Sequence, residues 1–156
     1  MPRPADLAEE LERVWRGDAG GDAWHGPALA TVLRALPPAA AGARPVPSAH
    51  SVREILEHVV AWRGFTQARV AGGTPSPPED DGWAALPTPT AAEWGELLRR
   101  ARDVEDRLLA SVRALSDAEA ERHAGALRFL LNHDLHHGGQ ISLLAGALAR
   151  GSAGSP

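Results

Sequence analysis

Apolar side chains recur every three or four positions along four long stretches of this chain. The stretches cover residues 6–15, 51–72, 90–115 and 125–149, and polar or charged side chains fill the positions between the apolar ones. This spacing places the apolar residues on one face of an α-helix. The pattern therefore predicts four principal helices, each with a buried face and a polar outer face.

Capping signatures mark where three helical segments begin. Ser51, Thr90 and Ser116 each stand three residues before a glutamate. In this capping box the hydroxyl and the glutamate satisfy backbone N–H groups that the first turn leaves unpaired. The first two signatures open long helices, whereas the third is interpreted as a single short turn.

The connections between the helices are rich in Pro, Gly and Ala. The spacing of apolar residues predicts one further, shorter helical piece over residues 24–36, with Pro27 in its first turn and Pro37–Pro38 ending it. The longest connection, residues 74–89, is Pro-rich and carries Trp83. Loops of this length in compact domains are often functional, and the sequence leaves open whether this one covers a site.

Composition agrees with an all-α domain. Much of the 44% hydrophobic content is Ala, Tyr is absent and there are two Phe, which favours helix over sheet. A length of 156 residues suits one domain with a substantial core. We therefore predict an all-α, antiparallel four-helix bundle with an extra short N-terminal helical piece. Residues 1–150 are expected to form this single domain, and residues 151–156 a flexible tail.

Charge and the missing cysteines narrow the function classes. A net charge of −4 argues against a nucleic-acid binder held by phosphate contacts. No apolar run approaches the roughly 18–20 residues of a membrane span, and the N-terminus has no apolar signal segment. We expect a cytoplasmic protein without nucleic-acid or membrane partners. The absence of Cys removes disulfides, thiolate nucleophiles and Cys-ligated metals.

The histidines are the chemistry-bearing residues that stand out. Residues 132–140 hold three of the seven, and His133 and His137 are four positions apart, one turn apart on a helix. Two imidazoles at this spacing can bind one divalent ion. His136 also shares a face with His133, but His137 lies nearer the apolar stripe because Ile141 follows one turn later. Spacing alone does not separate a metal pair from a polar helix edge.

His58 is the candidate third ligand because it lies in the apolar stripe of a different helix. A buried imidazole needs a partner, and a metal shared with the other two histidines would supply one. A hydrogen-bonded core histidine is the alternative. His25, His50 and His123 stand near helix ends or loops and are expected to be exposed, although His25 or His50 could border a pocket.

Three blocks of sequence carry a resemblance to a known family. They are WHGP at residues 24–27, HSVREILEHVVAW at residues 50–62 and NHDLHHGGQ at residues 132–140. In this order they resemble the DinB/YfiT-like superfamily of small metal-binding four-helix bundles. The resemblance implies that His58, His133 and His137 are the metal ligands. It also implies a homodimer and places the chain beside transferases and isomerases that use bacillithiol or mycothiol.

Three imidazoles would leave a divalent ion an open position for water or substrate. Zinc and nickel both suit such ligands, so either is the expected cofactor. Gln140, one turn beyond His137, is the candidate catalytic residue because it could orient a bound water or substrate. Asp134 and Asn132 could hold the imidazoles in place, and a solvated polar residue is the alternative for each.

The leading hypothesis is a metal-dependent enzyme acting on a small molecule. It is either a transferase that uses a low-molecular-weight thiol or a hydrolase. Because the chain has no Cys, any thiolate must come from a cosubstrate. The alternative is a non-catalytic helical bundle that binds metal or serves a structural role as a dimer.

Overall fold

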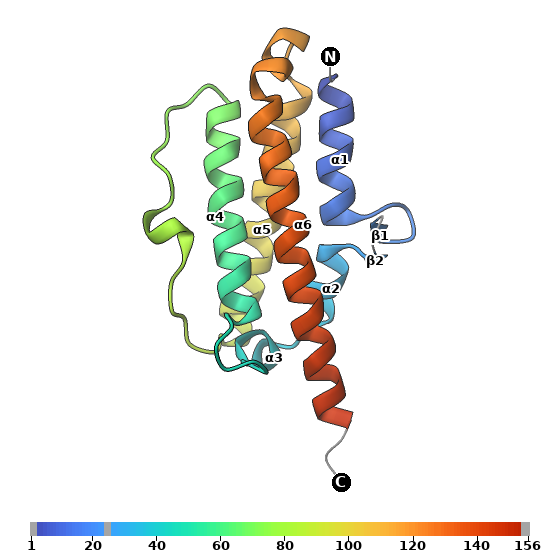
Figure 1. Ribbon diagram of the computed structural model, residues 1–156, viewed down its shortest axis with the longest axis vertical. Helices are drawn as coiled ribbons and strands as arrows, with labels where there is room; N and C mark the ends of the chain where they lie inside the picture. The colour runs from blue at the N-terminus through green and yellow to red at the C-terminus, as the bar shows by residue number, and fades with distance from the viewer. Residues whose placement is uncertain (1–2, 24–25, 154–156) are drawn as a thin grey trace.

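The computed structural model describes residues 3–23 and 26–153, and four long helices lie side by side in it (Figure 1). They are α1 (Pro4–Arg16), α4 (Val52–Val70), α5 (Ala91–Arg113) and α6 (Asp117–Ala153). The predicted all-α bundle is confirmed. The strands of the described residues are β1 (Asp22–Ala23) and β2 (Gly26–Pro27), two residues each and antiparallel.

The described ranges also contain three short helical elements: α2 (Leu29–Ala35), α3 (Pro38–Gly42) and the 3₁₀-helix η1 (Glu79–Gly82). The helical piece expected over residues 24–36 is thus present, but it begins later because Pro27 pairs with Asp22 in the small sheet. Pro37–Pro38 ends α2 as predicted. Because Pro is also tolerated in a first turn, Pro38 opens α3 inside the expected connector. Trp24 lies outside the described residues.

Helix α6 is longer than predicted at both ends. The prediction of a separate turn at residues 116–119 is wrong, because the capping box of Ser116 and Glu119 opens α6 itself. Ala120 and Ala124 are buried and extend the apolar stripe, so Gly125 lies inside the helix rather than at its start. The helix continues to Ala153, into the expected tail, whose flexibility stays a prediction. Neither α6 nor any other helix in the described ranges is apolar enough over sufficient length to cross a membrane.

The helix directions differ from a fully antiparallel bundle. Contacts between α4 and α5 advance together, from Arg53 with Glu93 to Gln67 with Ser111, so these helices are parallel. The antiparallel prediction is wrong for this pair. The connection of residues 71–90 is long enough to return from the end of α4 to the start of α5 (Figure 1). Helices α1 and α6 run opposite to this pair.

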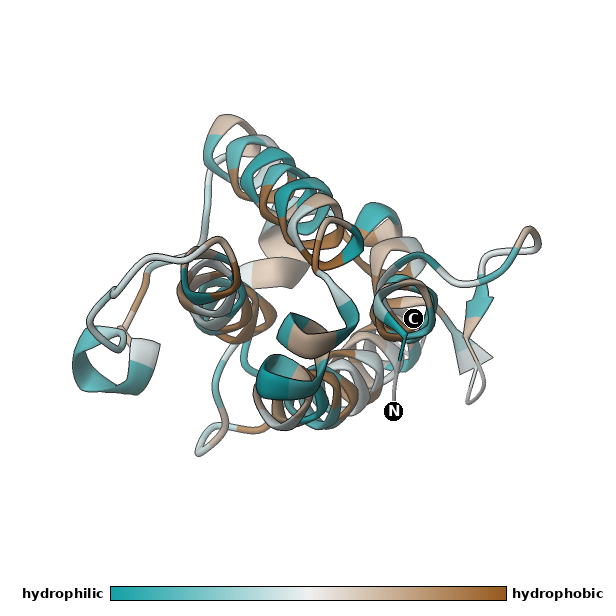
Figure 2. Cartoon of the chain, turned by 90° about the horizontal axis from the view of Figure 1, so that it is seen from above, coloured by the Kyte–Doolittle hydropathy of each residue, from teal (hydrophilic) through white to brown (hydrophobic). Residues whose placement is uncertain are grey.

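The apolar faces of the helices point inward, as Figure 2 shows. They form two separate clusters. The first contains Trp15, Leu56 and Trp94, and the second is built around Leu11, Leu108 and Leu130. Along α4, α5 and α6 the two clusters occupy different segments. Arg63, Glu105, Asp134 and His137 are buried polar residues between those segments, and buried His58 lies beside them within the α4 segment of the first cluster. This polar layer positions the site.

Candidate metal centre

Three histidines meet inside the bundle, His58 from α4 and His133 and His137 from α6. One potential ligand atom of each lies within 4.8 Å of the others. Nε2 of His58 is 2.8 Å from Nε2 of His133. His58 and His137 are buried, with exposed fractions of 3% and 6%. In the described part of the chain no fourth His, Cys, Asp or Glu joins this group.

The pair on α6 reaches His58 because the two helices cross in opposite directions at this level. His133 and His137 lie one turn apart on the face of α6 that packs against α4. Their ring centroids are 4.9 Å and 4.6 Å from that of His58. The structure thus brings together the three histidines singled out from the sequence.

Polar partners orient the two histidines of α6. Nδ1 of His137 donates to Oε1 of Gln140 at 2.7 Å, since an amide oxygen can only accept. Nδ1 of His133 lies 3.4 Å from a carboxylate oxygen of Asp134. Protonation at Nδ1 leaves the lone pair on Nε2, the atom that faces the cluster. Gln140 and Asp134 therefore act on the site by positioning imidazoles.

Burial favours the neutral forms of His58 and His137. Desolvation, with the neighbouring His137 and His133, lowers the pKa of His58 from 6.5 to about 4. Desolvation also lowers the pKa of His137, although its hydrogen bond to Gln140 acts in the opposite direction. Neutral imidazole is the form that binds metal.

The donor set fits a divalent cation. Nε2 of His58 and Nε2 of His133 face each other, and one must carry a proton for the two to hydrogen-bond. With that proton on His58, its buried Nδ1 has no hydrogen-bond partner within the described residues. A divalent ion held by these residues would take the place of that proton, and His58 could then carry its own proton on Nδ1, toward the backbone of Asp81. The three residues could therefore hold a metal ion.

Trp83 covers one side of the cluster. Its ring stacks on His58, with centroids 3.9 Å apart, and on His50 from the other side, at 4.0 Å. The long connection is held over the site by Trp62, which donates to the carbonyl of Asp81, and by buried Glu54. The sequence left open whether this loop covers a site, and the structure shows that it does.

Glu54 ties the loop to the start of α4. Its carboxylate accepts from the backbone N–H of Leu86 and, in the capping box, from that of Ser51. The capping residue predicted from the sequence thus also binds the loop. Arg53, one position earlier, donates to the carbonyl of Pro87 at 2.8 Å.

The backbone of the loop packs against His58 at Gly82. Three successive residues, Asp80, Asp81 and Gly82, have left-handed backbones with φ of 47°, 57° and 80°. A Cβ at Gly82 would lie 3.3 Å from Nδ1 of His58, a tight contact in a backbone conformation that disfavours side chains. Glycine therefore allows the loop to pack directly against the cluster.

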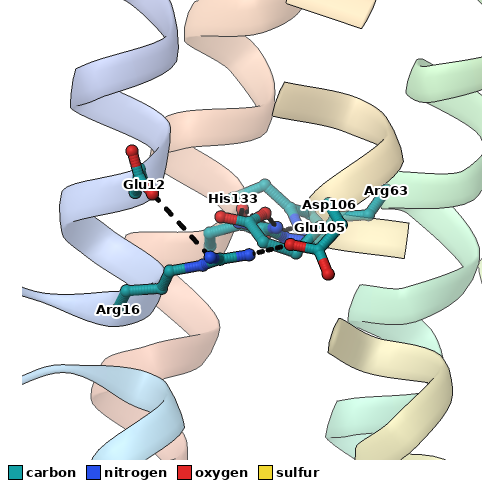
Figure 3. A network of polar contacts seen from close by, with 7 residues as sticks. Glu12, Arg16, Arg63, Glu105, Asp106 and His133 are labelled. Atoms are coloured by element: carbon teal, nitrogen blue, oxygen red, sulfur yellow. Dashed lines mark hydrogen bonds and ion pairs between the residues drawn. The ribbon is translucent and has the colours of Figure 1, made fainter. Parts of the chain in front are cut away.

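A buried ion cluster adjoins the metal centre. Arg63 is fully buried, donates to Asp134 at 2.9 Å and pairs with Glu105 of α5. Figure 3 shows Arg63, Glu105 and His133 meeting between α4, α5 and α6. The Arg63 guanidinium also stacks on Trp15 of α1, 4.4 Å from its ring centroid. This cluster, Arg63, Glu105 and Asp134, holds one guanidinium for two carboxylates, so its charge favours a cation nearby.

The remaining predicted residues fall outside the cluster. His136 and Asn132 are exposed, so His137 rather than His136 joins the site and the solvated alternative holds for Asn132. His50 is exposed but stacks on Trp83 at the border of the site. His123 is partly buried and lies elsewhere on α6, whereas His25 lies outside the described residues.

Sequence reasoning missed Arg63 and Glu105. Each is a charged residue at a position where the apolar stripe of its helix would be expected, and that was the available signal. A single charged residue in a stripe does not reveal its partner, which here lies on another helix. The role of Trp83 was equally hidden, because the path of a long loop is not encoded in local spacing.

A family comparison agrees with this geometry. The family model of the DinB superfamily matches residues 23–141. The chain belongs to the DinB superfamily. The matched range includes all three histidines, and DinB-like proteins are metal-binding. No curated protein and no solved structure gave a match to this chain.

The buried cluster makes Arg63 a sensitive position for this DinB-superfamily chain. Arg63→Ala leaves the carboxylates of Glu105 and Asp134 buried without their cation, which should lower the free energy of unfolding by about 3–5 kcal/mol. Arg100→Ala is the matched control, because Arg100 pairs with Glu57 near the surface and its loss should cost less than about 1 kcal/mol. Urea unfolding measures both. Equal losses would contradict the role given to Arg63.

The low pKa of His58 predicts a pH-dependent stability of the metal-free protein. Above pH 6.5 the imidazole is neutral whether the chain is folded or unfolded. Between pH 6.5 and about 4 the unfolded chain takes up a proton that folded His58 does not, so the free energy of unfolding falls as pH falls.

Chelator-treated wild type and His58→Gln should be unfolded in urea across this pH range. The wild-type loss attributable to His58 is on the order of 3 kcal/mol, and His58→Gln should show a correspondingly smaller slope. His136→Gln, at an exposed position, is the control with the wild-type slope. Identical slopes for all three proteins would show that His58 does not titrate as described.

Proposed function

We propose that this DinB-superfamily chain is a metal-dependent enzyme whose metal is held by His58, His133 and His137. One observation carries the proposal: three imidazoles converge, and no fourth ligand of the usual types joins them within the described residues. Structural zinc sites fill all four positions with protein ligands, whereas catalytic sites keep one open. The donor set therefore supports catalysis over a purely structural metal.

Zinc and nickel are the proposed metals because imidazole suits both. Bound there, a divalent ion supplies Lewis-acid chemistry, favouring deprotonation of water or of a thiol, or polarising an electrophile. The substrate is a small molecule. Since the chain has no Cys, a transferase of this kind takes its thiol from a low-molecular-weight cosubstrate, and a hydrolase needs only water.

Residues of the chain orient the metal-binding imidazoles and limit the access of water to them. Gln140 and Asp134 fix the rings of His137 and His133. The amide nitrogen of Gln140 is left as a donor toward a bound water or substrate, which is the catalytic role proposed for it. Trp83 stacks on His58 and limits access of bulk water from that side.

A homodimer is part of the proposal, on the strength of the family resemblance. Phe129 and Leu143 are exposed apolar side chains on α6, with exposed fractions of 59% and 67%. A partner chain would cover such side chains. The same two side chains could form the dimer contact in the alternative function, a non-catalytic metal-binding or structural helical bundle.

Metal content of the purified protein tests the site. Wild type should carry about one divalent ion per chain after incubation with zinc or nickel, and His137→Ala should lose it because two imidazoles remain. His136→Ala, which changes an exposed neighbouring histidine, should keep the wild-type content. Elemental analysis measures all three. A metal-free wild type, or full loading of His137→Ala, would remove the basis for the enzyme.

The effect of a chelator separates the two functions. For the enzyme, removal of the metal should abolish turnover with thiol cosubstrates or hydrolysable esters while the melting temperature changes little. A structural metal should instead stabilise the fold strongly, because an ion that binds only the folded chain shifts the unfolding equilibrium. A large fall in melting temperature without any turnover by the loaded protein would favour the non-catalytic bundle.

A further inference from the structure

A pocket separate from the metal centre lies where α1, α2 and α5 meet. Its volume is about 550 Å³, within the range of small-molecule sites. None of its lining residues belongs to the metal centre or to the loop that covers it. The function proposed for the metal centre assigns nothing to this pocket.

The base and walls of the pocket are apolar. Trp15, Leu33 and Ala101 form its base and are buried, and Leu98 of α5 is a half-buried wall. Gly95, one turn before Leu98, also lines the groove, and a Cβ there would lie in open space. An apolar group bound here would be removed from water against these side chains.

Arginines surround the opening. Arg16 is neutralised by Glu12 and Asp106, whereas neither Arg34 nor Arg102 forms an ion pair with a carboxylate among the described residues. Arg34 donates to the hydroxyl of Thr31 at 3.4 Å, and both guanidiniums are exposed. In a chain of net charge −4, two uncompensated guanidiniums beside one apolar groove form a local site for an anion.

We propose that this pocket binds a small carboxylate with an apolar body. The carboxylate pairs with Arg34 and Arg102, because the planar guanidinium matches carboxylate geometry with two parallel hydrogen bonds. The apolar body lies along Gly95 and Leu98 over the buried base. A neutral molecule of the same shape keeps the apolar contact and loses the ion pairs.

Octanoate is the probe, and octan-1-ol is its neutral counterpart. Titration calorimetry of the full chain should show octanoate binding at least about tenfold more tightly than octan-1-ol, the effect of a charge-assisted hydrogen bond. The double variant Arg34→Gln/Arg102→Gln should remove this preference. The control Arg107→Gln/Arg128→Gln makes the same charge change at exposed positions outside the pocket and should retain it.

A steric variant tests the location independently of charge. Gly95→Leu places a side chain in the groove, and Leu in place of a helical Gly should favour the helix. It should weaken octanoate binding at least about tenfold, whereas Ala110→Leu, at an exposed position on α5 outside the pocket, should leave it unchanged. Circular dichroism confirms folding of each variant.

Three results would overturn the proposal. They are equal binding of octanoate and octan-1-ol, full binding by Gly95→Leu, and absence of binding by wild type at millimolar octanoate. If octanoate does not bind and Gly95→Leu changes the sedimentation of the protein, the pocket is occupied by a second copy of the chain. The metal is not required for any of these measurements, so failure of the enzyme proposal would not affect them.

Discussion

The ion cluster centred on Arg63 is the interaction on which the rest of this structure depends. A fully buried guanidinium is tolerated only where carboxylates surround it, and here they come from two different helices, Glu105 of α5 and Asp134 of α6. Arg63 itself belongs to α4 and stacks on Trp15 of α1. The side chain of Arg63 therefore connects α4 with the other three principal helices, and a shift of α4, α5 or α6 would leave a charge unpaired.

The pairing of Arg63 with Asp134 fixes the axial position of α4 relative to α6. It therefore also determines which residues of the two helices face each other, including the histidines. Apolar contacts tolerate small slides along a helix, since any methyl group can replace another in a similar environment. A buried ion pair does not tolerate such slides, because its hydrogen bonds require a particular distance and direction between the charged groups. Asp134 is adjacent to His133 in the chain, and Arg63 lies little more than one turn beyond His58. Pairing Arg63 with Asp134 thus brings the two histidines together.

Features of the fold and the site that depend on residues close together in the sequence could be predicted, whereas features that depend on contacts between distant segments could not. Helix positions and the set of His58, His133 and His137 were predictable, since periodicity, capping and family motifs are local in sequence. The parallel direction of α4 and α5 was not, because residues 71–90 are held by contacts such as Glu54 with Leu86 that connect separate elements. The start of α6 was misplaced because burial of Ala120 and Ala124 outweighs the cost of a helical Gly125.

The net negative charge of the buried ion cluster favours binding of a cation nearby. Two carboxylates surround one guanidinium in a region that water does not reach, and Asp134 also lies against His133. Two of the three adjacent imidazoles, those of His58 and His137, favour their neutral forms, since burial lowers the pKa of both. A cation with several coordination sites would satisfy the facing Nε2 atoms and the buried negative charge together. The arrangement that stabilises the bundle is therefore the one that favours a metal ion at the three histidines.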